Sequence, residues 1–288
     1  MPNTRDIRRR IKSVKNTAQI TKAMQMVAAS KMRKAQQLAL NGRPYGDLLR
    51  KMTLAVRGLT EGETHPLLEE RPIKKEIVIL ISTDKGLCGA LNTNLTRLAA
   101  SYYPATTSFI TLGRKGAQWV TRSKRHLLAD FQLPDSPSFL ESKAISKFVI
   151  ERFLTKEVDR VTVLSTKFVN TLSQTPIALV ALPVQPLPDE EVQEESPNAD
   201  VSAKNITFEP DPYSFLDSLV PYSVHMAVYG AVLEARASEH SARMVAMKNA
   251  TDNAKDLIKD LTLEYNKIRQ ASITTEINEI ATAQLALG

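Results

Sequence analysis

The sequence predicts an α/β domain joined to a long antiparallel coiled coil, which the N-terminal and C-terminal segments form together. Residues 3–41 contain no Gly or Pro, and residues 222–287 contain one Gly and no Pro. Between them, residues 72–190 alternate apolar runs of strand length with helical patterns. This alternation is typical of a central, mostly parallel sheet flanked by helices, whereas the two Gly- and Pro-poor runs predict helices too long for a compact domain.

The N-terminal run has a coiled-coil period, because its seam residues recur at alternating steps of four and three. A helical bundle with a mixed core would show a similar period, so that alternative stays open. The seam consists of Ile7, Ile11, Val14, Ala18, Thr21, Gln25, Ala28, Met32 and Ala35.

The C-terminal run shows the same period over almost seven heptads. At 1.5 Å per residue it would make a helix of roughly 100 Å, so the shorter N-terminal helix can cover only part of it. Residues 280–288 carry no charge, and we expect this uncharged tip to lie inside a partner. The predicted seam consists of Met226, Gly230, Leu233, Ala237, His240, Met244, Met247, Thr251, Ala254, Ile258, Leu261, Tyr265, Ile268 and Ser272.

The central region predicts strands and helices in alternation. A glycine-containing turn, residues 83–92, follows the first strand and precedes a helical stretch, an arrangement that can bind phosphate. It matches neither common phosphate-binding motif, so a tight turn with close helix–sheet packing is the preferred interpretation. The predicted strands are 76–83, 107–112, 160–166 and 176–183, and further helices are predicted at 114–122 and 140–154.

These patterns divide the chain into four parts. Residues 183–212 hold six of the fifteen prolines and a cluster of five acidic residues, which indicates an exposed loop or hairpin. The predicted parts are an N-terminal helix (1–58), a Rossmann-like α/β domain (72–190), an acidic, proline-rich loop (191–212) and a C-terminal helix (213–288).

Composition limits the possible functions. The single cysteine, Cys88, excludes an internal disulfide framework and fits a reducing compartment. No apolar run approaches the length of a membrane span, and the N-terminus lacks a secretory apolar region. No metal-ligand spacing is present, and Cys88 and the four histidines belong to no recognisable catalytic motif, so we expect no catalytic site, metal or cofactor.

Positive charge is concentrated in the first helix. Residues 1–40 contain ten Lys and Arg residues and one acid, Asp6, whereas the rest of the chain sums to −2. Four interpretations stay open: a transit peptide, a nucleic-acid-binding helix, a helix that meets an acidic protein surface, and a solvated basic face.

Motifs along nearly the whole chain resemble the γ subunits of F-type ATP synthases. The strongest lie in the C-terminal helix, at Ser241–Ala254 and Leu261–Ile280, and in the N-terminal helix, at Ile11–Lys31. Ala90 stands where the family often has Gly, and the cysteine insert of chloroplast members is absent. Shorter matches, in the same order as in the family, are Thr83–Gly89, Lys167–Asn170 and Glu209–Pro212.

This resemblance implies a rotor shaft that turns inside a ring of α and β subunits, with the central domain docked to the ε subunit and the membrane ring of c subunits. It further implies a peripheral location on the cytoplasmic side of a bacterial inner membrane. The residues that it assigns to the catalytic ring are Lys22, Met24, Arg33, Lys34, Arg243, Gln270, Leu285 and Leu287, and those on the c-ring side are Phe208 and Glu209.

Two other functions would fit parts of the sequence. A basic coiled-coil protein that binds nucleic acid would show salt-sensitive DNA binding. A nucleotide-binding α/β enzyme would bind nucleotide through residues 72–190.

Overall fold

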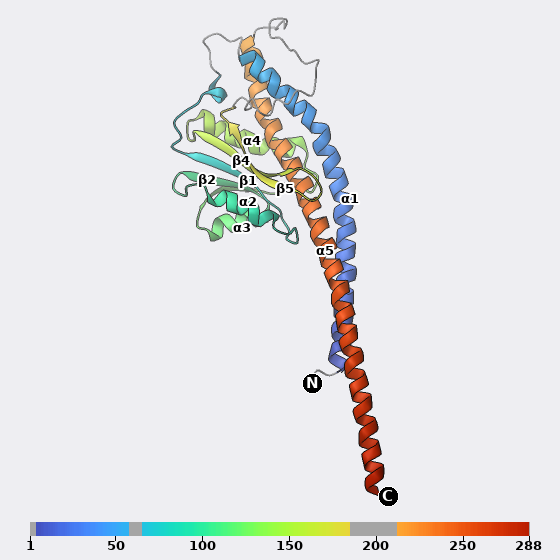
Figure 1. The fold of residues 1–288 in the computed structure, drawn as a ribbon. Helices are drawn as coiled ribbons and strands as arrows, with labels where there is room; N and C mark the ends of the chain where they lie inside the picture. Colours follow the sequence, from blue (N-terminus) through green and yellow to red (C-terminus); the bar gives the residue numbers. More distant parts are fainter. Residues whose placement is uncertain (1–3, 58–64, 185–211, 288) are drawn as a thin grey trace. The chain divides into compact units, whose positions relative to one another are not determined.

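The computed structural model describes residues 4–57, 65–184 and 212–287, and the chain divides into two compact units. Unit 1 comprises residues 1–29 and 243–288, and unit 2 comprises residues 30–242. Two long helices, α1 (Thr4–Arg57) and α5 (Pro212–Leu287), contribute residues to both units (Figure 1). Most of the predicted acidic loop lies outside the described residues.

Unit 2 is built on a five-stranded sheet in the order β3-β2-β1-β4-β5. The first four strands in sequence pair in parallel and β5 runs antiparallel to β4, which confirms the mostly parallel sheet. The strands are β1 (Glu76–Ile81), β2 (Thr107–Leu112), β3 (His126–Phe131), β4 (Arg160–Phe168) and β5 (Gln174–Leu182).

Helices cover both faces of this sheet (Figure 1). Helices α2 (Leu91–Ala100) and α3 (Arg114–Arg122) pack on the face that carries Val78 and Leu80. Helix α4 (Phe139–Leu154) and residues 216–235 of α5 pack on the opposite face, which carries Ile77 and Ile79. The core of unit 2 therefore includes a section of the C-terminal helix.

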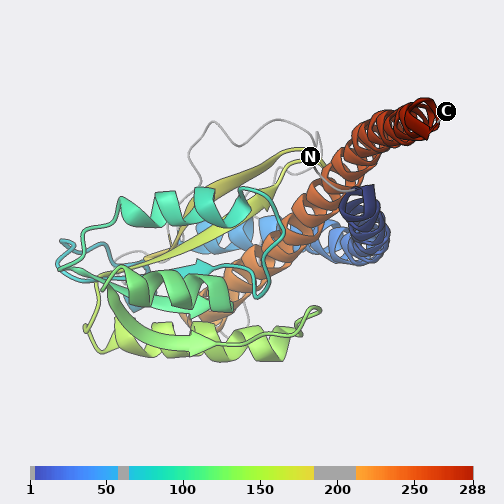
Figure 2. The same cartoon turned by 90° about the horizontal axis from the view of Figure 1, so that it is seen from below.

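Unit 1 is the predicted coiled coil, and its two helices run side by side (Figures 1 and 2). Ile7, Thr21 and Ala28 of α1 are buried, and the other seam positions up to Gln25 are half-buried. On α5, Met247, Thr251, Ala254 and Leu261 are buried, so the predicted seam is confirmed. Ser272 is an exception, because it is exposed and lies beyond the part of α5 that pairs with α1.

Polar groups also join the two helices of unit 1. The hydroxyl oxygens of Thr21 and Thr251 lie 2.8 Å apart in the buried seam. Nearer the start of α1, Arg8 Nη2 donates to the Tyr265 hydroxyl at 2.5 Å and its guanidinium lies over the Tyr265 ring. These contacts fix which residues of the two helices face each other.

The long helices extend beyond their Gly- and Pro-poor cores. Helix α1 continues through Pro44 to Arg57, and α5 starts at Pro212 and continues through Pro221. In this part of α1, Ala39 and Leu49 are buried within unit 2. Burial of side chains in unit 2 outweighs the low helix propensity of Gly42, Pro44 and Gly46.

Candidate interaction surfaces

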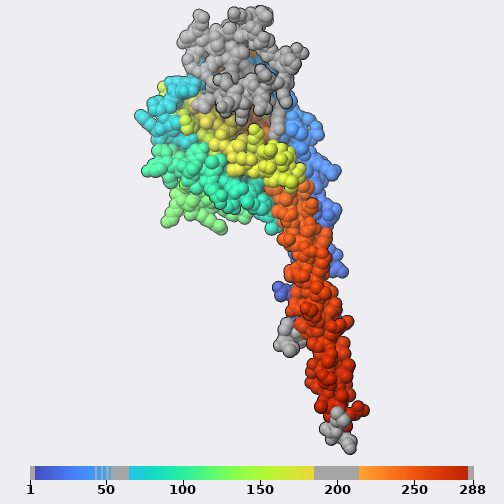
Figure 3. Space-filling view, viewed as in Figure 1, coloured from blue at the N-terminus to red at the C-terminus, as the bar shows by residue number. Residues whose placement is uncertain are grey.

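The exposed end of α5 in unit 1 carries an apolar stripe. Every residue from Arg269 to Gln284 is exposed, and the helix extends past α1 with no other described part of unit 1 beside it (Figures 1 and 3). Ile273, Ile277 and Ile280 are 47%, 59% and 65% exposed and follow one another at steps of four and three. They form an exposed apolar stripe on the part of α5 that extends past α1, which indicates a partner from another chain.

Helix α1 presents a basic outer face. Lys22 in unit 1 and Arg33 and Lys34 in unit 2 are exposed, and Met24 is half-buried. Lys22 Nζ donates to Gln25 Oε1 of the same helix at 3.4 Å. Because this hydrogen bond is long and the Lys22 side chain is exposed, the ammonium group is accessible to an external partner. The predicted ring contacts on α1 are therefore on or near the surface.

The predicted contacts on α5 differ in their exposure. Gln270 is exposed on the unpaired end, whereas Arg243 is half-buried. Leu285 and Leu287 belong to the helix, but their side chains lie outside the described residues, as do Phe208 and Glu209. The sequence prediction did not single out Ile273, Ile277 and Ile280, because the 4-3 steps of the seam lead from Ser272 to Thr275 and Glu279 instead.

The glycine-containing turn after β1 closes on itself. The Thr83 hydroxyl donates to the Lys85 carbonyl at 2.7 Å, and Asn92 Nδ2 donates to the Thr83 hydroxyl at 2.7 Å. Leu87 and Gly89 have positive φ values of 63° and 60°, and Cys88 is buried beside Asn92. This geometry supports the preferred interpretation, a tight packing turn rather than a phosphate cradle.

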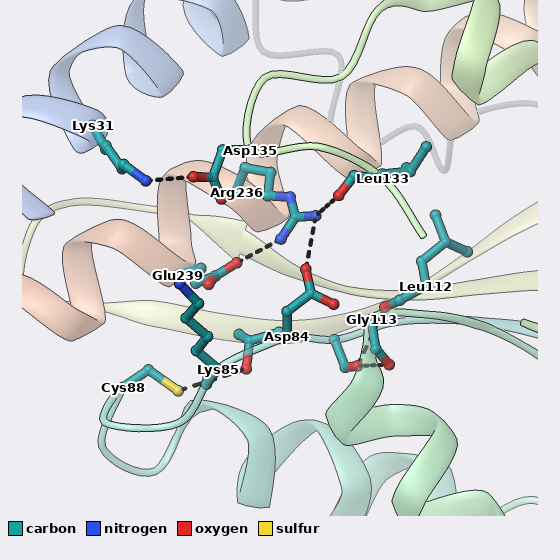
Figure 4. Close-up of polar contacts among 12 residues, drawn as sticks. Lys31, Asp84, Lys85, Cys88, Leu112, Gly113, Leu133, Asp135, Arg236 and Glu239 are labelled. Carbon is teal, nitrogen blue, oxygen red and sulfur yellow. Dashed lines mark hydrogen bonds and ion pairs between the residues drawn. The ribbon is translucent and has the colours of Figure 1, made fainter. Parts of the chain in front are cut away.

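An ionic cluster lies beside this turn, at the carboxyl end of the sheet (Figure 4). The buried guanidinium of Arg236, on α5, donates to Glu239 Oε2 at 2.9 Å and to the Leu133 carbonyl at 2.9 Å. Its Nη2 also lies 3.5 Å from Asp84 Oδ2. The cluster therefore ties α5 to two loops of the sheet, and sequence motifs gave no sign of it.

A second ion pair holds the same loop from the other long helix. Lys31 of α1 donates to Asp135, and this bond lowers the pKa of the Asp135 carboxyl below its usual range (Figure 4). Both side chains are about half exposed, at 46% and 56%, so water screens the pair. Its contribution to stability is therefore small, about 0–1 kcal/mol.

Two histidines are buried in unit 2. His225 on α5 has its Nδ1 2.6 Å from Ser146 Oγ, and burial, followed by the charge of Lys143, lowers its pKa. Burial also lowers the pKa of His65, although Asp217, 3.4 Å away, acts in the opposite direction. Both therefore favour the neutral form in the folded chain.

Unit 2 should lose stability as the pH falls below about 6.5, because the unfolded state binds protons to these histidines more tightly than the folded state does. The stabilisation is present above the unfolded pKa and is lost as the pH falls through the folded pKa. Urea unfolding, followed by fluorescence of Trp119 in α3, should give a lower midpoint at about pH 5.5 than at about pH 7.5.

The control for this pH effect is His225→Gln, which retains a side chain able to bond Ser146 and removes the titration. Its midpoint should change less between the two pH values. An equal change in the variant and the parent chain would contradict the assignment to His225. The carboxylates with lowered pKa values, including Asp135, act at lower pH and do not interfere.

Within the described residues, no group of three or more His, Cys, Asp or Glu side chains could hold a metal ion. In the same part of the chain, no helix has the length and apolar character that a membrane crossing requires.

Comparison with known proteins agrees with the sequence motifs. A family model described as ATP synthase matches residues 3–287. The ATP synthase gamma chain of Methylacidiphilum infernorum is 50% identical over 100% of both chains, and that of Opitutus terrae is 49% identical over 99% of both.

Solved structures show a similar fold. The central stalk and c-ring structure of the Tetrahymena thermophila mitochondrial ATP synthase contains a chain that is 25% identical, with a TM-score of 0.59, over 80% of this chain and 99% of that one. A chain of the Euglena gracilis mitochondrial ATP synthase is 21% identical, with a TM-score of 0.68, over 99% of this chain and 94% of that one. With full-length identity of about half to bacterial relatives, this chain belongs to the ATP synthase gamma chain family.

Proposed function

We propose that this chain is the rotating central stalk of a bacterial F-type ATP synthase and couples ion flow across the membrane to ATP synthesis or hydrolysis. Unit 1 would turn inside the ring of α and β subunits, and unit 2 would dock to the ε subunit and the c ring. The observation that carries this assignment is the isoleucine stripe of α5, which is exposed on the end of the helix that extends past the start of α1. A helix end of this kind requires an apolar surface supplied by another chain.

The ring contacts are assigned by the resemblance to the family and supported by exposure. Lys22, Arg33 and Lys34 lie on the exposed face of α1, suited to acidic segments of the ring, with Met24 beside them. Gln270 is exposed on the unpaired end of α5 and can hydrogen-bond a ring loop; Arg243 is assigned by resemblance alone. Leu285 and Leu287 would extend the apolar stripe into the ring, and Phe208 and Glu209 would face the c ring.

The seam suits a part that turns among several partners. It contains Ala, Thr and Met at positions where tight coiled coils carry Leu and Ile, and such residues bury less apolar area per turn. We infer that this keeps the shaft slender, so that the outer faces of both helices pass successive ring subunits without a tight fit to any one. The complex would hold the chain at the cytoplasmic side of the bacterial inner membrane.

Catalysis belongs to the complex and not to this chain. The comparisons return ATP synthase chains, and they give no support to the alternative of a nucleic-acid-binding protein. We therefore assign the positive charge of α1 to the binding of an acidic protein surface and not of nucleic acid.

Reconstitution tests the assignment. The purified chain alone should neither bind nor hydrolyse ATP, and adding it to α and β subunits of the same organism should give a complex with sustained ATP turnover. Ile273→Asp and Ile277→Asp together should weaken that assembly, whereas Lys259→Asp, also exposed on α5, serves as the matched control. ATP turnover by the chain alone, or assembly unaffected by the two aspartates, would contradict the proposal.

Single Ala substitutions of Lys22, Arg33 or Lys34 should reduce coupled turnover only mildly. Exposed ion pairs are solvated and screened by salt, so each change should reduce the rate by about fivefold at most. The measurement is ATP-driven proton uptake by vesicles that contain the assembled complex. Loss of assembly caused by any one of these substitutions would instead indicate a fixed, buried ion pair.

A further inference from the structure

The sheet of unit 2 has a topological switch point between β1 and β4. From β1 the chain proceeds through α2 and α3 to β2 and β3 on one side, and it then returns through α4 to β4 on the other side. In open α/β sheets, the crevice at the carboxyl ends of the strands beside such a point is where ligands bind. This crevice is therefore the place where a domain of this topology would hold a small molecule.

In this chain, α5 fills that crevice. Ser238 Oγ donates to the Thr166 carbonyl at the end of β4 at 3.0 Å, and Arg236 lies beside Asp84, which follows β1 (Figure 4). The space that is left has a volume of about 10 Å³, lined by residues that include Ser82, Thr166 and Glu239. That volume holds one water molecule at most, so a nucleotide has no room there.

The contacts in the crevice differ in kind from the rest of the packing between α5 and the sheet. Elsewhere, α5 packs through apolar side chains such as Val220, Val224 and Val228. Apolar contact is not directional and resists small rotations of a helix weakly. Arg236, with a side chain only 8% exposed, contacts two loops of the sheet through Leu133 and Asp84 and holds α5 in one orientation about its axis.

We propose that Arg236 is a positioning residue for coupled turnover: its contacts with Asp84 and Leu133 lock α5 into the switch-point crevice and transmit torque between the shaft helix and the sheet, while Glu239, on α5 itself, orients the guanidinium. This inference rests on the proposed function, in which α5 and unit 2 must turn together. The crevice that would bind a ligand in another doubly wound sheet thus serves here as the site where α5 is attached to the sheet.

The test uses complexes that contain the variant chain, in sealed vesicles, with ATP hydrolysis and ATP-driven proton uptake measured on the same sample. Arg236→Met, which keeps the volume and removes the charge, should reduce protons taken up per ATP hydrolysed by about twofold or more. Arg236→Lys should restore part of that ratio, because it returns the charge without the forked geometry. Lys31→Met is the matched control, because it removes an exposed cation of α1 that pairs with Asp135 in the same loop, and its ratio should not change.

Asp84→Asn provides the decisive variant if Arg236→Met fails to assemble. Asparagine retains the oxygen that accepts the Arg114 backbone N–H at 3.2 Å, and it removes only the charge that faces Arg236. A lower ratio in Asp84→Asn supports the proposal. An unchanged ratio, with or without a lower unfolding midpoint, would overturn it and leave the cluster a purely structural role. Failure of the parent complex to pump protons would count instead against the proposed function.

Discussion

Replacement of Ala254 by Pro is expected to abolish coupled turnover of the assembled complex. Ala254 is a buried seam residue of α5 in unit 1. Proline removes its backbone N–H donor and clashes with the preceding turn, at a cost of about 3 kcal/mol or more, and it kinks the helix. A kinked helix cannot turn concentrically within a closely fitting ring. The measurement is ATP-driven proton uptake beside ATP hydrolysis in reconstituted vesicles.

Ala254→Gly is the matched control for this variant. Glycine lowers the helix propensity at the same position by about 1 kcal/mol, retains the N–H donor and introduces no ring. The glycine variant should therefore retain most of the coupled turnover. Normal coupling in the proline variant would show that α5 need not be continuous at this position.

Gly113→Ala is expected to destabilise unit 2 strongly. Gly113 lies between β2 and α3 with φ at 101°, and an added Cβ would lie 2.3 Å from the Ser82 carbonyl oxygen. Left-handed strain and displacement of the backbone together should cost roughly 2–6 kcal/mol. Urea unfolding followed by Trp119 fluorescence measures this loss, since Trp119 lies on the helix that Gly113 precedes.

Gly86→Ala provides the comparison in a neighbouring turn. A Cβ at Gly86 would have nothing within 4 Å, so the free energy of unfolding should change by less than about 0.5 kcal/mol. Equal stability of the two alanine variants would refute the clash at Gly113.

Periodicity predicted the parts of the fold that depend on side-chain burial alone. The seam positions from Ile7 to Gln25 are buried or half-buried, and β1, an unbroken apolar run, is fully buried. The pattern failed at β3, where only Leu127, Leu128 and Ala129 are consecutively apolar. This strand lies at the edge of the sheet with half-exposed residues, so its sequence carries no strong alternation or apolar run.

The sites were predictable to different degrees. Exposure of Lys22 and Gln270 follows from their positions off the seam. The exposed isoleucines could not be found by continuing the seam, because its steps past Ser272 lead to Thr275 and Glu279. The Arg236 cluster could not have been predicted, because Asp84, Leu133 and Arg236 come from three segments that only the tertiary fold brings together. A mid-helix arginine in a sequence is indistinguishable from a solvated one until its neighbours are known.

Because the two strands of the coiled coil come from opposite ends of the chain, the order of synthesis restricts how unit 1 can form. Helix residues 4–29 leave the ribosome first, and their partner residues start at 243. At common rates of translation, the basic helix waits roughly 10–40 s for its partner. During that interval its seam is open while unit 2 is still being made. Unit 1 must therefore close last, and a nascent chain that stalls before residue 243 leaves the strongly cationic N-terminal helix without its partner.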